Sequence, residues 1–161
     1  MFSGSFNKEI HEILKSVLKT DRSVSVVILG DRTGLTIARV AKLLAAETLG
    51  GDMETMAAIA SAVYCGAAEQ GYSLTLGDLD IMIAEFDDGT ILTSSCGAGI
   101  LIIVTEAKKQ LGVIRVEMKK ASGDLSKIMS EISTTTKPPA AAVKKEEGQS
   151  IMSALKELEN F

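Results

Sequence analysis

The chain has 161 residues, 46% of them hydrophobic and 4% aromatic, with a formal net charge of −4. This composition suits one domain with an aliphatic core and argues against nucleic-acid binding, which needs basic patches or stacked aromatic side chains. Two cysteines, Cys65 and Cys96, are too few for a disulfide framework or a zinc site.

The apolar runs are shorter than the ~18–20 residues of a membrane span. The N-terminal stretch MFSGSFNKEIHEILK carries charges where a signal peptide needs an apolar core. We therefore expect a cytoplasmic protein without membrane insertion.

The first half of the chain predicts a helix, a hairpin and a second helix. Residues 6–20 carry apolar side chains at helical spacing, and residues 23–29 and 35–40 are typical of strands. Residues 41–50 permit either a helix or an irregular continuation of the strand. Residues 52–70 form the longest helical pattern, with Asp52 as its cap and Gly71 at its end.

The stretch VVILGDRTGLT, residues 26–36, resembles a glycine-rich phosphate loop. A phosphate loop leads into a helix whose N-terminal amides hold the anion, whereas a strand follows here. The stretch also lacks the Gly-Lys-Ser/Thr and G-x-G-x-x-G patterns. With Asp31 first and Gly34 fourth, it is typical of a type I turn in a hairpin, so we expect no cofactor.

The second half predicts a meander and a long helix. Residues 79–86, 90–95 and 99–105 are strand-like and are separated by glycine turns, and a helical pattern follows over residues 109–132. The fold class is therefore α+β. We expect a five-stranded, mainly antiparallel sheet with helices packed in layers, in the order α-β-β-α-β-β-β-α.

The composition changes after the last helix. Residues 1–132 form the predicted domain, residues 133–149 (STTTKPPAAAVKKEEGQ) a flexible linker, and residues 150–161 a short tethered helix. The apolar residues of that helix are too few to fold alone, so we expect them to dock on the domain or on a partner: Ile151, Met152, Leu155, Leu158 and Phe161. Deleting residues 140–161 tests this.

The helix over residues 52–70 has almost no charge between Glu54 and Glu69. A helix on a solvated surface normally carries a charged face, and small side chains allow a second helix to approach closely. One interpretation is that one stripe covers the sheet and the rest faces water. We favour a homodimer or partner interface formed by Met53, Met56, Ala57, Ala60, Ser61, Val63, Tyr64, Ala67 and Ala68.

Enzyme chemistry finds little support. Ser94 to Gly99 does not fit the G-x-S-x-G pattern, and the single histidine, His11, lies on the first predicted helix. The aspartates Asp78, Asp80, Asp87 and Asp88 lack the spacing of a calcium loop. Arg32 at the hairpin tip could act as an arginine finger, although a solvated surface residue is the simpler interpretation. We expect no enzyme, no catalytic residues and no metal.

The order of these elements resembles the Roadblock/dynein light chain family over about residues 6–132. Four stretches carry the resemblance: VVILGDRTGLTIARV, GDMETMAAIASAVYCGAAE, IMIAEFDDGTILTSSCGAGILIIVTE and LGVIRVEMKKA. The resemblance implies the Roadblock/profilin-like fold. It also implies a small, non-enzymatic and usually dimeric protein whose two sheets join and whose central helices pair.

The resemblance further implies a platform for Ras-like small GTPases, as in the prokaryotic-type regulators of this family. Such a platform selects one nucleotide state or acts as a GTPase-activating partner. The alternative that it also allows is a structural scaffold or light-chain-like subunit of a larger complex, indifferent to the nucleotide state.

Overall fold

The computed structural model describes residues 4–49, 51–107, 110–135 and 156–158. The chain divides into two units, Met1–Ser130 and Glu131–Phe161, and the architecture below is that of the first. Most of the predicted linker and tail helix, including Ile151, Met152, Leu155 and Phe161, lies outside the described residues. Their docking stays a prediction.

The elements follow the predicted order with one addition. The structure has α1 (Gly4–Thr20), β1 (Val24–Asp31), β2 (Thr36–Ala41), α2 (Leu43–Leu49), α3 (Asp52–Ser73), β3 (Ile81–Phe86), β4 (Gly89–Cys96), β5 (Gly99–Glu106) and α4 (Leu111–Thr135). The α+β prediction is therefore confirmed. The segment that the sequence left ambiguous contains the short helix α2. Within the described residues, no helix combines the length and apolarity needed to cross a membrane.

All five strands form one antiparallel sheet in the order β2-β1-β5-β4-β3. The first hairpin joins the later meander through β1 and β5, with Val27 opposite Ile103. These two central strands are fully buried over most of their length. The edge strands β2 and β3 each have a neighbour on one side only.

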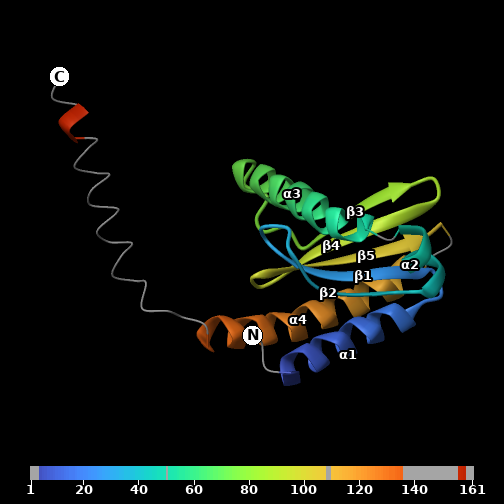
Figure 1. Cartoon of the computed structure of the whole chain (residues 1–161). Helices are drawn as coiled ribbons and strands as arrows, with labels where there is room; N and C mark the ends of the chain where they lie inside the picture. Colours follow the sequence, from blue (N-terminus) through green and yellow to red (C-terminus); the bar gives the residue numbers. More distant parts are fainter. Residues whose placement is uncertain (1–3, 50, 108–109, 136–155, 159–161) are drawn as a thin grey trace. The chain divides into compact units, whose positions relative to one another are not determined.

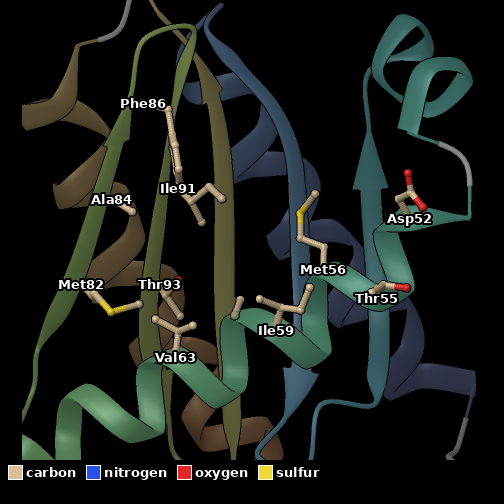
Figure 2. A pocket seen from close by; sticks show the side chains of 11 residues that line it. Asp52, Thr55, Met56, Ile59, Val63, Met82, Ala84, Phe86, Ile91 and Thr93 are labelled. Carbon is tan, nitrogen blue, oxygen red and sulfur yellow. The ribbon is translucent and has the colours of Figure 1, made fainter.

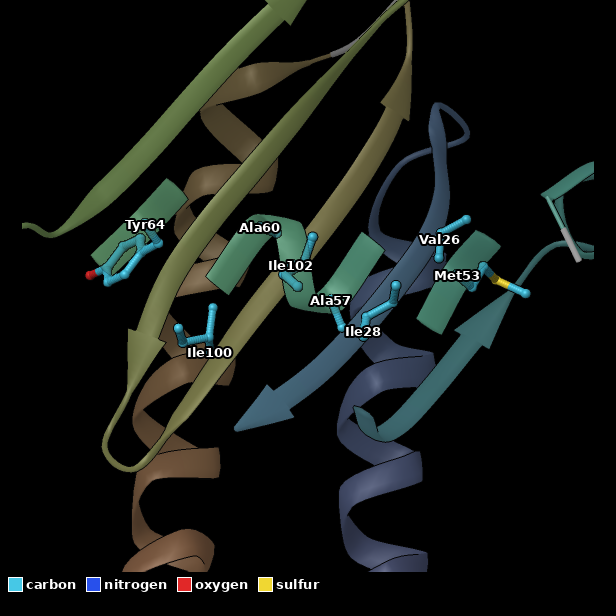
Figure 3. Close-up of a cluster of buried hydrophobic side chains, with 8 residues drawn as sticks. All are labelled: Val26, Ile28, Met53, Ala57, Ala60, Tyr64, Ile100 and Ile102. Carbon is cyan, nitrogen blue, oxygen red and sulfur yellow. The ribbon is translucent and has the colours of Figure 1, made fainter. Parts of the chain in front are cut away.

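Helices cover both faces of the sheet, but unequally. Helices α1 and α4 lie side by side on one face, and α3 crosses the other (Figure 1). Because side chains alternate along a strand, Val26 and Ile28 of β1 face α3, while Val27 and Leu29 face the opposite layer. Figure 3 shows the cluster beneath α3, made of Val26, Ile28, Met53, Ala57, Ala60, Tyr64, Ile100 and Ile102.

The ends of α3 differ from the expectation. The N-cap is Gly51, with Asp52 in the first turn, and the cap receives no side-chain hydrogen bond. The helix continues past Gly71 because the Leu74 amide still reaches the Gln70 carbonyl at 3.1 Å. It ends where Thr75 adopts a positive φ of 56°.

Candidate protein interaction site

On the face that carries α3, the described helices cover only part of the sheet (Figure 1). Five strands spaced about 4.8 Å apart span roughly 19 Å, whereas one helix covers about 10 Å. On the opposite face two helices share this task, and the Ser94 hydroxyl of β4 meets the Ser122 hydroxyl of α4 at 2.7 Å. Among the described residues, α3 crosses this face (Figure 1) and α2 packs against the cluster beneath it, and no second helix lies over β3 and the outer part of β4.

The bare strip and the flank of α3 form a groove of about 440 Å³. Its walls are almost entirely apolar. From the sheet come Met82, Ala84, Phe86, Ile91 and Thr93, and from α3 come Asp52, Thr55, Met56, Ile59, Ala60 and Val63. Figure 2 shows Val63 and Ile59 on the helix side and Phe86 beside Ile91 on the sheet side.

The large side chains around this groove are exposed to solvent. Phe86 is 61% exposed, Ile59 59% and Val63 53%. Contiguous exposed apolar surface of this kind marks a contact site in soluble proteins. The groove is therefore a candidate interaction site.

The structure divides the predicted interface stripe into two parts. Met53, Ala57, Ala60, Ser61 and Tyr64 are buried against the chain's own sheet. Their side chains are therefore largely covered by their own chain, although Ala60 also lines the groove, and their part in an interface stays a prediction. The Tyr64 hydroxyl donates to the Leu79 carbonyl at 2.7 Å, and the Ser61 hydroxyl donates to the Arg32 carbonyl at 3.0 Å.

The remaining residues of the stripe lie nearer the surface. Met56, Ala67 and Ala68 are half-buried and Val63 is exposed. They are accompanied on the outward face of α3 by further uncharged residues that the prediction did not include, namely Thr55, Ala58, Ile59, Ala62 and Gly66. The absence of charge noted in the sequence thus belongs to this outward face.

Sequence reasoning missed the sheet side of the groove. Met82, Ala84 and Phe86 of β3 were assigned only to a strand, although the run IMIA is apolar on both of its faces. Alternation alone predicts a polar outer face for an edge strand that borders water. A strand apolar on both faces is the signal that could have revealed a second covering layer.

The tip of the first hairpin is anchored to α3 and to the turn between β4 and β5. One oxygen of the Asp31 carboxylate accepts from the Thr33 hydroxyl at 2.6 Å and from the amides of Thr33 and Leu35 at 2.9 and 3.0 Å. These bonds, led by the Thr33 hydroxyl, lower the pKa of Asp31. Gly34, with φ 95°, packs on the backbone of Ala58. The type I turn prediction is consistent with this geometry, and the strand β2 follows the loop where a phosphate site would require a helix.

Arg32 projects from the same tip. Its guanidinium donates to the Ser95 hydroxyl and the Gly97 carbonyl, both at 3.4 Å. The side chain is exposed and in part held by its own chain. Arg32 therefore links the turn of the first hairpin to the turn between β4 and β5.

The hydroxyl and thiol groups near the β4–β5 turn are either hydrogen-bonded or buried. Cys96 is buried, and burial raises the pKa of its thiol to about 12, so the thiol is protonated at neutral pH and a poor nucleophile. The Ser95 hydroxyl donates to the Gly97 carbonyl at 3.4 Å. Asp80, one of the aspartates weighed as a metal ligand, pairs with Lys119 at 2.9 Å.

Comparison with known proteins places this architecture in a family. A family model described as mitogen-activated protein kinase kinase 1 interacting matches residues 8–132. The chain belongs to this family. An uncharacterised protein of Methanocaldococcus jannaschii is similar to this family member, with 32% identity over 115 residues, 70% of this chain and 90% of that protein. Two more from the same organism are 31% identical over 94 residues, 58% of this chain and 82% of each relative.

Solved structures show the fold of this family member. The gliding protein MglB from Thermus thermophilus superposes with a TM-score of 0.73 at 19% identity, covering 81% of this chain and 96% of that one. MglB from Myxococcus xanthus gives 0.67 at 19% identity, with 76% and 96% covered. A Roadblock/LC7 domain from Streptomyces avermitilis gives 0.66 at 16%, with 74% and 96% covered. The predicted Roadblock fold is confirmed.

Proposed function

We propose that this protein is a non-catalytic homodimeric platform that binds a Ras-like small GTPase and responds to its nucleotide state. The observation that carries the proposal is the apolar groove between α3 and β3, which the described residues leave open. The Roadblock fold supports the choice of partner class, because the resemblance in the sequence implies GTPase platforms.

A second copy is the expected occupant of the groove. The strand β3 is an unpaired edge, and a two-fold axis beside it would extend the sheet and place two α3 helices together over the bare strips. Such an isologous interface uses the same patch twice. Ile59, Val63 and Phe86 would then be buried in both subunits.

The GTPase requires a surface that the dimer leaves free. Beyond the groove, the C-terminal end of α3 and its capping turn expose Tyr72 (78%), Leu74 (61%) and Leu76 (75%). We assign the partner contact to this end of α3. Selection between nucleotide states would follow from differential contact with the switch segments of the GTPase, so no catalytic group from this chain is required.

The dimer is tested by light scattering of the full chain at micromolar concentration. We expect a dimer mass for the wild type and a monomer mass for Ile59→Glu/Val63→Glu, because two carboxylates would be buried in the interface. Val113→Glu/Val116→Glu on α4 is the control, since Val113 and Val116 are also exposed, at 47% and 71%. A monomer mass for the wild type would refute the dimer.

Partner binding is tested by affinity capture with the full chain as bait, once with a non-hydrolysable GTP analogue and once with GDP. We expect a small GTPase enriched in one nucleotide state, and loss of that enrichment for Leu74→Ser/Leu76→Ser with dimerisation retained. A partner set without a GTPase, or one equal in both states, would contradict the regulatory function.

A scaffold function is the second candidate, and the family match favours it. The matching family is described by its interaction with mitogen-activated protein kinase kinase 1, which is a contact with a kinase and needs no nucleotide selectivity. A scaffold predicts the same dimer and the same partners in both nucleotide conditions. The capture experiment therefore separates the two candidates.

A further inference from the structure

The start of α2 lies close to the turn after α1, and this corner of the domain exposes two adjacent leucines. Leu43 and Leu44 open α2 and are 77% and 74% exposed. Ala45 and Leu49 of the same short helix pack against the core cluster beneath α3. These inner contacts fix the helix, so the two leucines are held outward. Scattered single apolar residues are ordinary on a protein surface, and an adjacent pair forms a larger apolar patch than either residue alone.

Positive charge lies on one side of this leucine pair. Lys19 near the end of α1 and Arg22 in the turn that follows are exposed and, with Lys42, line a hollow of about 310 Å³. The Lys42 ammonium donates to the Arg22 carbonyl, which ties the start of α2 to the turn after α1. In a chain with a net charge of −4, three cations are thus concentrated beside Leu43.

The acidic residue in the hollow is already engaged. Asp21 accepts from the Ser23 hydroxyl at 2.6 Å and from the Ser23 amide at 2.8 Å. Two further exposed acidic residues flank the hollow, Glu47 on α2 and Glu106, whose amide donates to the Ser23 carbonyl at 2.8 Å. Asp21 offsets one of the three cations, so the lining of the hollow itself retains excess positive charge. An anionic surface complements that charge.

The form of the corner favours a lipid surface over a protein. Protein interfaces bury aromatic or arginine anchors in concave pockets and are depleted in lysine. Here the two leucines protrude and two of the three cations are lysines. Leucines beside lysine and arginine are typical of elements that bind in the interface of anionic membranes.

We propose that this corner binds anionic membranes, with Leu43 and Leu44 entering the lipid interface and Lys19, Arg22 and Lys42 contacting the headgroups. The contact is with the membrane surface. It goes beyond the proposed function and does not depend on it, because β2, which leads into the corner, and β3 lie at opposite edges of the sheet. A dimer through β3 leaves the corner accessible.

The test is flotation of the full chain with phosphatidylcholine vesicles, with and without phosphatidylserine. We expect binding to the anionic vesicles only, weakened by added salt. Leu43→Ser/Leu44→Ser and, separately, Lys19→Gln/Arg22→Gln should each reduce binding by roughly tenfold or more. The matched controls on α4 are Val113→Ser/Val116→Ser and Lys120→Gln/Lys127→Gln, which should bind as the wild type does.

Three outcomes would overturn the proposal. They are no binding to anionic vesicles, equal binding to neutral vesicles, and unchanged binding of the leucine variant. A lower mass of the leucine variant in lipid-free light scattering would assign the pair to contact between copies instead. Circular dichroism of each variant separates loss of binding from loss of fold, and an unfolded double variant is replaced by its single substitutions.

Discussion

At the scale of single residues, polar contacts of Asp21 and Asp31 set the turns that the sheet depends on. The Ser23 hydroxyl and amide hold the pKa of Asp21 below its ordinary value, and the pKa of Asp31 is lowered mainly by the Thr33 hydroxyl. These hydrogen bonds therefore stabilise the ionised form of both carboxylates. Each turn leads directly into or out of β1.

Replacing Asp31 by alanine should lower the free energy of unfolding by about 1 kcal/mol at neutral pH, since exposed turn bonds contribute modestly. The pKa of Asp31 is depressed in the folded state, so its contribution is present above the ordinary value near 3.8 and is lost as the pH falls through the folded value. Urea unfolding from pH 7 to pH 3 measures this.

The difference between wild type and Asp31→Ala should shrink over the acid range. The control is Glu47→Ala, which removes an exposed carboxylate from α2 without a turn. A difference that stays constant down to pH 3 would show that the ionised carboxylate is not the stabilising form.

Gly34 is a position where a side chain is poorly tolerated. A Cβ there would lie 2.7 Å from the Ala58 Cα, and φ is 95°. Gly34→Ala should therefore lower the free energy of unfolding by about 2 kcal/mol or more. Gly123→Ala is the matched comparison, because Gly123 lies in the interior of α4 and no atom lies within 4 Å of its Cβ position, and it should stabilise α4 by about 0.5–1 kcal/mol. Equal effects in thermal or urea unfolding would contradict the packing of the hairpin tip on α3.

At the scale of elements, the periodicity of apolar residues predicted most of the helices and strands. The strands, their hairpins and the amphipathic α1 could be read because their apolar side chains recur every two or every three to four residues. The interface residues could not be read in the same way. Helix α3 is uncharged on nearly every side between Glu54 and Glu69, and only the packed structure shows that Ala57 and Tyr64 face the sheet while Ile59 and Val63 face outward.

Helix α2 shows a further limit of sequence reasoning. Its seven residues give too few turns for a periodic pattern, and its two exposed leucines break the expected distribution. Its position is decided by tertiary contacts, in which Ala45 and Leu49 meet the core cluster. Such short helices depend on packing rather than on propensity.

Shortening a side chain on the inner face of α2 should therefore lower the free energy of unfolding more than shortening one on its outer face. Leu49→Ala should lower the free energy of unfolding by about 1–2 kcal/mol, because it removes a partly buried side chain. Leu44→Ala should change it by less than about 0.5 kcal/mol. Urea denaturation of both variants measures the difference, and a larger loss for Leu44→Ala would reverse the orientation described for α2.

At the scale of the whole molecule, the two faces of the sheet are unequal. One face carries α1 and α4, and the other carries α3 over part of its width (Figure 1). A protein that completes its cover by pairing with a copy of itself has a stability that depends on concentration, because mass action favours the paired folded state.

The melting temperature of the wild type should accordingly rise by a few degrees for each tenfold increase in protein concentration. That of Ile59→Glu/Val63→Glu should stay constant, since its subunits do not pair. Differential scanning calorimetry from micromolar to near-millimolar protein measures both. A wild-type melting temperature that does not depend on concentration would remove the link between pairing and stability.

The pairing of β1 with β5 also has a consequence for the order of events during synthesis. Residues 24–31 leave the ribosome early, yet their central neighbour, residues 99–106, is made much later. Until then the apolar β1 has only β2 beside it, and a two-stranded hairpin is marginal in water. The nascent chain therefore carries an unfinished sheet through most of translation, which makes the early segment a natural client for ribosome-associated chaperones.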